Sequence, residues 1–94
     1  MDRLKITKEV IGLAYYVAEV EVLEDDNLKE YGMDSIALVS LIVEIEMKYN
    51  ITFSDDDLNP DNLITINNIV DMMEKYLWNY GIIWKVKWKS IKVK

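Results

Sequence analysis

The sequence contains no cysteine and no histidine. Without cysteine the chain has no disulfide, no thiol nucleophile of its own and no thiolate ligand for a metal. Without histidine it lacks the side chain that most often serves as a general base and as a metal ligand. These two absences exclude most hydrolytic and transfer mechanisms for a chain of this size, and they favour a carrier or a binding module over an enzyme.

Long hydrophobic runs are missing too. No stretch approaches the roughly 20 apolar residues that a membrane-spanning helix needs, and mixed polar sequence follows the N-terminus where a signal peptide would have an apolar core. We therefore expect a cytoplasmic protein. With 94 residues, 51% hydrophobic and 30% charged, the chain suffices for one globular domain with a modest core.

Basic residues are scarce in most of the chain. Residues 1–77 hold all 17 acidic residues and six basic ones, a net charge of −11, whereas residues 78–94 hold five lysines and no acidic residue. The negative field of the body repels nucleic acid and attracts basic protein surfaces, so we expect no nucleic-acid partner. The basic aromatic tail could bind a partner or an anionic membrane surface. Folding back on the body is favoured, because it would cover the tryptophans.

Apolar residues recur at helical spacing in three segments. The first covers about residues 6–20, where Thr7 can cap the helix start. The second covers residues 35–49, and Asn50 can end it in the left-handed conformation. The third begins after Thr65, which is another capping residue, and continues to about residue 77.

The connections between these segments are rich in turn residues. The long connection over 21–34 is acidic, with isolated apolar anchors at Leu23, Leu28 and Tyr31. Residues 51–53 are expected to be an extended connector, and residues 59–62 allow a short helical turn. The sequence therefore predicts an all-α fold, a small antiparallel bundle of three main helices plus one short helix. It would form one domain over 4–78, followed by a tail over 79–94.

A short motif stands where the long connection meets the second helix: Gly32-x-Asp34-Ser35-Ile36, followed by Val39. An isolated Asp-Ser pair at a helix start is usually only an N-cap. Here the surrounding pattern matches as well, in Tyr49-Asn50-Ile51-Thr52-Phe53-Ser54-Asp55 and in Asp57-Leu58-x-Pro60-x-Asn62. Together these segments resemble the acyl and peptidyl carrier protein family over the whole body of the chain. The last run looks more like stand-alone, D-alanyl or peptidyl carriers than fatty-acid carriers.

The resemblance implies that Ser35 accepts a 4′-phosphopantetheine arm from coenzyme A, transferred by a separate phosphopantetheinyl transferase that uses Mg²⁺. The thiol of the arm would carry acyl or aminoacyl groups as thioesters. In this family Asp34 helps to position the serine and the metal, and Gly32 allows close approach. Unpaired N–H groups in the first turn of a helix favour a phosphodiester at Ser35. No histidine can activate this serine, so the base must come from the partner enzyme.

The resemblance also implies acyl- or aminoacyl-loading and synthase enzymes as partners. Ile36, Leu38 and Val43 could leave an exposed apolar strip beside the arm, or all three could belong to the core. Glu44, together with Glu46 and the run Asp55-Asp56-Asp57, could meet basic patches on partners or simply keep the domain soluble. This run lacks the alternating ligands and the glycine of an EF-hand loop, so we expect no metal site. We expect a monomer.

Two departures from the family pattern narrow the expected partners. Ser40 stands where fatty-acid carriers usually have a glutamate, and Ala37 replaces a commonly polar position. Polyketide, nonribosomal-peptide, D-alanyl and fatty-acid type biosynthesis all use the same arm, so the sequence leaves the carried group open. A different class also stays open: an unmodified helical adaptor that binds a protein partner through its acidic surface and tail.

Overall fold

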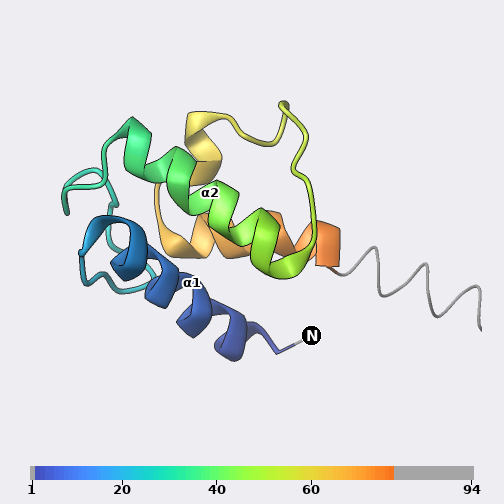
Figure 1. Cartoon of the computed structure of the whole chain (residues 1–94), viewed down its shortest axis with the longest axis horizontal. Coiled ribbons are helices and arrows are strands. Elements are labelled where there is room, and N and C mark those ends of the chain that lie inside the picture. Colours follow the sequence, from blue (N-terminus) through green and yellow to red (C-terminus); the bar gives the residue numbers. More distant parts are fainter. Residues whose placement is uncertain (1, 78–94) are drawn as a thin grey trace, which may run out of the picture.

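The computed structural model describes residues 2–77. Its helices are α1 (Arg3–Ala18), α2 (Ser35–Tyr49), the short 3₁₀ helix η1 (Pro60–Leu63) and a last helix over residues 66–77 (Figure 1). Within this range no residue forms a strand. The predicted all-α fold with three main helices and one short helix is therefore confirmed.

The start of α1 differs from the prediction. Asp2 is the N-cap, because its carboxylate accepts a hydrogen bond from the backbone N–H of Lys5 at 3.2 Å. Thr7 lies inside the helix and is buried, so its assignment as the cap was wrong. Arg3, Leu4 and Lys5 are good helix formers, which lets the helix extend back to the earlier capping residue. The helix ends at Glu19, which adopts the left-handed conformation.

Two predicted capping residues are confirmed. Asn50 ends α2 with a φ of 55°, and its N–H donates to the carbonyl of Glu46. The Thr65 hydroxyl accepts the N–H of Asn68 at 3.1 Å and so caps the 66–77 helix. At η1, the Asn59 side chain accepts the N–H of Asp61 at 3.0 Å.

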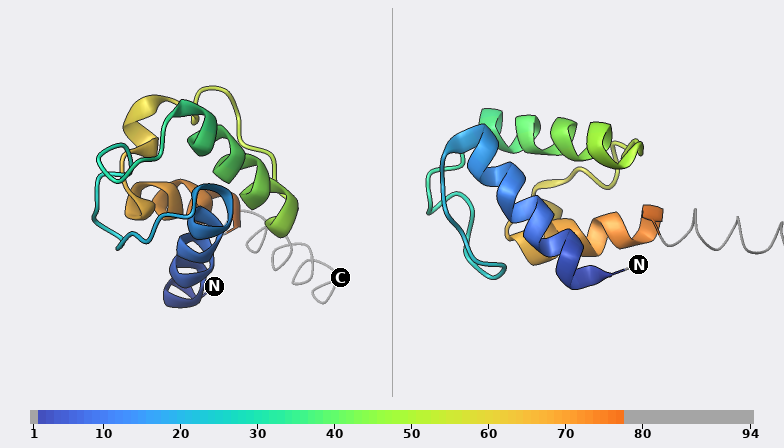
Figure 2. Two further views of the ribbon diagram at one scale, coloured as in Figure 1. Left: turned by 60° about the vertical axis from the view of Figure 1, so that its left-hand side comes forward. Right: turned by 60° about the horizontal axis from the view of Figure 1, so that its bottom comes forward.

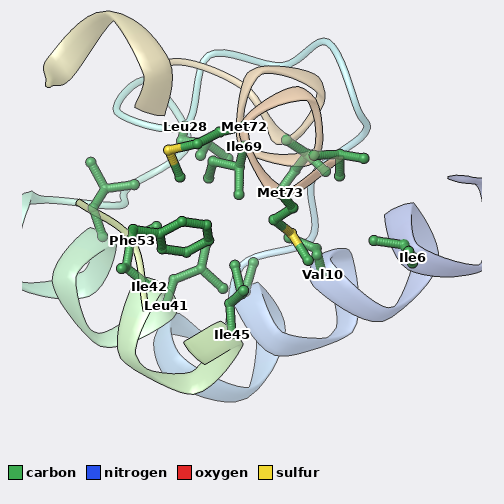
Figure 3. Packing of buried hydrophobic residues seen from close by; sticks show 14 of the residues in the cluster. Ile6, Val10, Leu28, Leu41, Ile42, Ile45, Phe53, Ile69, Met72 and Met73 are labelled. Atoms are coloured by element: carbon green, nitrogen blue, oxygen red, sulfur yellow. The ribbon is translucent and has the colours of Figure 1, made fainter. Parts of the chain in front are cut away.

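A single hydrophobic core lies between the three main helices (Figure 3). Residues from α1 and α2 point toward the inner face of the 66–77 helix, and Leu28 and Phe53 fill the space beside them. The buried residues of the last helix are Ile66, Ile69, Val70, Met72 and Met73.

The long connection after α1 is fixed to the N-terminal end of the last helix. The N–H of Leu28 donates to the carbonyl of Ile64, and the N–H of Asn67 donates to the carbonyl of Glu24, both at 2.9 Å. Leu28 is fully buried, as predicted for an anchor, but Leu23 and Tyr31 are exposed. These two expected anchors were wrong, because hydrogen bonds to a distant helix decide which side of the connection faces the core.

No helix among residues 2–77 combines the length and the apolar content needed to cross a membrane. The basic tail over 79–94, the boundary proposed at residue 78 and the expectation that the tail folds back all lie outside the described residues.

Candidate attachment site

A tight turn sets the position of the motif serine. The N–H of Gly32 donates to the carbonyl of Lys29 at 3.2 Å, and the N–H of Met33 donates to the carbonyl of Leu28 at 3.0 Å. This pair of bonds is the Schellman pattern, which needs a left-handed residue at the position of Gly32. Gly32 has a φ of 96°. Because Leu28 and Met33 are both fully buried, the core holds both ends of the turn.

Asp34 and Ser35 begin α2 directly after this turn. The Asp34 carboxylate accepts the N–H of Ala37 at 2.8 Å and caps the helix. Ser35 is the first residue of α2, and its side chain is exposed. The backbone N–H groups of a first helical turn and the helix dipole both favour an anionic group at this position. The predicted site residues Asp34 and Ser35 are therefore adjacent at one helix end, and Gly32 shapes the backbone that leads to it.

A groove of about 430 Å³ opens beside Ser35. Its apolar walls come from α2 and from the segment around η1, and four polar residues complete the lining. The apolar lining residues are Leu38 and Val39 on α2 and Leu58, Pro60, Leu63 and Ile64 on the other side; the polar ones are Ser35, Asn27, Lys29 and Asp61. We call it the Ser35 groove. Its volume and its apolar walls suit a flexible chain attached to the serine.

Lys29 is a further candidate site residue, which the sequence motif did not include. It lines the Ser35 groove together with Ser35 and is exposed. Between Lys8 and Lys48 it is the only basic residue of the chain, so it supplies the positive charge nearest to Ser35 in sequence. The signal was available as an isolated lysine in an acidic connection, six residues before the serine. An ammonium group there favours a phosphodiester on Ser35.

An apolar strip runs along the exposed side of α2. Its members are Ile36, Val39, Val43 and Met47, spaced three or four residues apart, and we call them the α2 strip. Ile36 has an exposed fraction of 78% and Val43 is also exposed, so these two residues belong to an exposed strip and not to the core. Leu38, at 6%, belongs to the core, because its position on the helix faces inward. Its inclusion in the exposed strip was wrong, and Val39 and Met47 are members that the sequence analysis missed.

Some of the acidic residues expected to meet partners are engaged within the domain. The Glu46 carboxylate accepts the N–H of Phe53 at 2.8 Å. Asp57 accepts hydrogen bonds from the hydroxyls of Tyr76 and Ser54, and the Tyr76 bond is the main reason why the pKa of Asp57 is lowered. Glu44 is half-buried on α2. Asp55 and Asp56 are exposed, and no group of acidic residues in the described chain has the geometry to hold a metal ion.

Comparisons with known proteins agree with this geometry. Residues 5–73 match the family described as phosphopantetheine attachment site. The acyl carrier protein of Coprothermobacter proteolyticus is 29% identical over 82 residues, which cover 83% of this chain and 98% of the relative. The acyl carrier protein of Desulforapulum autotrophicum is 30% identical over 70 residues, which cover 72% of this chain and 88% of the relative.

A solved structure confirms the fold. The similar chain comes from the crystal structure of a Bradyrhizobium japonicum glycine:carrier protein ligase complexed with glycylated carrier protein. The TM-score is 0.61 at 24% identity, over 74% of this chain and 96% of that chain. The family match implies a covalently attached 4′-phosphopantetheine and a non-enzymatic role. This chain belongs to the family of acyl carrier proteins and phosphopantetheine-binding carrier domains.

Proposed function

We propose that this protein carries acyl or aminoacyl groups as thioesters on a 4′-phosphopantetheine arm attached to Ser35. The observation that supports this most directly is the exposed serine at the first position of α2, beside an apolar groove that also contains Lys29. The terminal thiol of the arm supplies the nucleophile that the sequence lacks. The protein is then a substrate of its partner enzymes and catalyses no step itself.

Attachment forms one bond and breaks one. The Ser35 hydroxyl oxygen bonds to the pyrophosphate phosphorus that carries the pantetheine, and the bond between this phosphorus and the bridging oxygen breaks. The bisphosphorylated adenosine leaves, and the hydroxyl proton passes to a base on the phosphopantetheinyl transferase, because this chain has no histidine or thiol to accept it. The resulting phosphodiester lies at the N-terminus of α2, where the helix dipole and Lys29 favour its negative charge.

The partners of this carrier would dock on the α2 strip. Any enzyme that acts at Ser35 must approach the surface next to it, where Ile36 and Val39 are exposed. A contiguous exposed apolar patch is typical of a protein interaction site, and the members of the α2 strip follow one another along one side of the helix. We propose the phosphopantetheinyl transferase and a loading ligase or synthase as the partners that use this surface. The glycylated carrier of the structural relative makes an aminoacyl group one candidate cargo.

Incubation with coenzyme A, Mg²⁺ and a broad-specificity phosphopantetheinyl transferase tests the attachment. We expect the intact mass to rise by one phosphopantetheine, and we expect no rise in Ser35→Ala. Ser40→Ala is the matched control, since it removes a half-buried serine from the same helix and should be modified normally. An unchanged mass of the unmutated protein would favour the unmodified adaptor instead, and a rise in Ser35→Ala would place the attachment elsewhere.

A further inference from the structure

A second groove lies along α1, apart from the Ser35 groove. Its volume is about 420 Å³. Ile11, Gly12 and Tyr15 of α1 line one side, and Val20, Glu21 and Val22 of the following segment line the other. We call it the α1 groove. Among residues 2–77, Glu21 is the only charged residue that lines this groove. The groove therefore combines an apolar floor with one acidic edge, and the carrier function assigns it no role.

Gly12 leaves the floor of this groove open. A glycine inside a helix costs about 1 kcal/mol relative to alanine. Apart from its chain neighbours and the nearby backbone of α1 itself, no heavy atom of the described residues lies within 4 Å of the position that a Cβ of residue 12 would occupy. Packing among the described residues therefore does not require glycine there, whereas an incoming side chain could use the space.

The chain segment that lines the α1 groove is acidic. Residues 9–28 hold six acidic residues and neither lysine nor arginine, and the basic residues next to this range in sequence are Lys8, one helical turn before Gly12, and Lys29. The salt bridges found in residues 2–77 involve only Arg3 and Lys75 as the basic partners. Glu19, Glu21 and Glu24 are exposed and take part in none of these bridges. A ligand of this groove should therefore bring apolar side chains together with positive charges.

We propose that the α1 groove is the docking site for residues 82–89 of the same chain. This segment reads Ile82-Ile83-Trp84-Lys85-Val86-Lys87-Trp88-Lys89, in which apolar residues and lysines alternate after the first three positions. Aromatic and aliphatic side chains would fill the space over Gly12, and the lysines would face Glu19 and Glu21. The acidic charge of the body and the basic charge of the tail then attract each other within one molecule.

The tether is long enough for this contact. The N-terminal end of α1 and the C-terminal end of the 66–77 helix lie at the same end of the molecule (Figure 2). The whole of α1 is about 24 Å long. Trp84 and Trp88 follow Leu77 by seven and eleven residues, which span up to about 23 and 36 Å when extended. A short tether also raises the effective concentration of the segment to the millimolar range.

The α2 strip is a poorer site for this segment. From Ser35 to Met47 the only acidic residues are Glu44 and Glu46, and Glu46 already accepts a hydrogen bond from Phe53. A segment with alternating lysines would find few carboxylates there. Charge complementarity therefore favours the α1 groove and leaves the surface beside Ser35 free for enzymes.

Paramagnetic broadening in the full-length apo protein tests the proposal. Because the chain has no cysteine, Ser90→Cys gives a single position for a nitroxide spin label. We expect the backbone amides of residues 11, 12, 15 and 21 to be broadened more than those of residues 36, 39 and 43. A mixture of ¹⁵N-labelled protein without nitroxide and unlabelled protein with nitroxide should show none of this broadening. The measurement needs no modified Ser35, so it is independent of the carrier function.

Two variants of the groove should abolish the effect, each with a matched control. Gly12→Leu fills the groove, and Glu21→Lys reverses its acidic edge, so both should lose the broadening. Gly12→Ala keeps the space, and Glu30→Lys makes the same charge change at an exposed position outside the groove, so both should keep it. All three tryptophans lie in residues 78–94, so their emission should shift to longer wavelength in the two groove variants only.

Several results would overturn the proposal. Absent or uniform broadening, or stronger broadening on α2, would show that residues 82–89 do not dock in the α1 groove. Broadening that also appears in the mixed sample would assign the groove to the tail of a second copy. Loss of broadening in Glu30→Lys as well would reduce the effect to unspecific charge attraction.

Discussion

The backbone N–H of Met33 donates to the carbonyl of Leu28 at 3.0 Å, and both side chains are fully buried. This bond closes the turn that ends one residue before Asp34, the N-cap of α2. The core therefore fixes both ends of this turn, and the turn in turn fixes the position of Ser35. A change in this turn should affect both the stability of the domain and the modification of Ser35.

Gly32→Ala should lower both the free energy of unfolding and the rate at which Ser35 is modified. The Cβ of residue 32 would meet only the Val20 side chain, at 3.7 Å, which is an ordinary contact. The penalty comes from the φ of 96°, where an L-residue loses about 1–2 kcal/mol. We expect urea unfolding to show this loss and the transferase to modify the variant more slowly. Gly12→Ala is the counterpart, because its Cβ meets nothing and its stability should rise by about 0.5–1 kcal/mol. Equal stability of the two variants would contradict this account.

Asp34 can be tested for two separable roles. Asp34→Ala removes the bond to the Ala37 N–H and should lower the free energy of unfolding by about 1 kcal/mol. Asp34→Asn keeps a capping oxygen and should stay within a few tenths of a kcal/mol of the unmutated protein. If the carboxylate also helps to position the transferase metal, Asn at position 34 should still slow the modification of Ser35. Modification of this variant at the normal rate would reduce Asp34 to a cap.

Lys29 should stabilise the phosphodiester after attachment. The lysine lines the groove that opens at Ser35, in a part of the chain otherwise poor in positive charge. In Lys29→Glu we expect modification to give a smaller rise in melting temperature than in the unmutated protein, by an amount equivalent to about 0.2–1 kcal/mol for an exposed charge pair. Lys29→Arg should restore the rise. A rise that is the same in all three proteins would show that Lys29 does not interact with the phosphate.

The α2 strip should contribute to recognition and not to folding. Val43 is exposed and lies two turns from Ser35, so Val43→Asp leaves the reacting atoms untouched. We expect a KM for the transferase about tenfold higher, equivalent to about 1.4 kcal/mol, with kcat little changed. Leu4→Asp makes the same kind of change at an exposed aliphatic residue of α1 and should leave KM as it was. Equal effects of the two variants would mean that overall charge, and not the strip, controls recognition.

The sequence predicts the elements that depend on local patterns. The bounds of α2, the left-handed Asn50 and the Thr65 cap follow from periodicity and capping preferences, and the structure confirms each. The start of α1 was misplaced, because Asp2 and Thr7 are both good capping residues and the choice depends on the helix formers between them. The inward side of the long connection could not be predicted, because it depends on bonds from Leu28 and Asn67 to distant partners.

In the candidate site, too, some features follow from local sequence and others from tertiary packing. Local sequence determines that Asp34 and Ser35 lie at a helix start. The Ser35 groove needs Leu58 and Ile64 to come beside α2, and only tertiary packing brings them there. Leu38 and Val39 are neighbours in sequence, yet one is buried and the other is exposed. When a helix has apolar residues on more than one face, its sequence does not show which face packs against the core and which stays exposed.

The stability of the domain should depend on pH through Asp57. The hydroxyl of Tyr76 donates to the Asp57 carboxylate, and this bond is the main cause of its lowered pKa. A carboxyl group whose pKa is lowered by folding adds stability above its unfolded pKa of about 3.9, and this contribution is lost as the pH falls through the lower folded value.

Tyr76→Phe keeps a ring that can pack edge-on against Phe53 but removes the hydrogen bond to Asp57. We therefore expect this variant to be less stable at pH 7, and the difference in free energy of unfolding to narrow below about pH 4. Part of the difference should persist, because the Tyr76 hydroxyl also accepts the N–H of Ser54 at 2.8 Å. Urea unfolding from pH 7 to pH 2 measures this, with the exposed Tyr16→Phe as a control that should show no difference at any pH. A difference for Tyr76→Phe that stays constant over the whole range would show that Asp57 titration does not contribute.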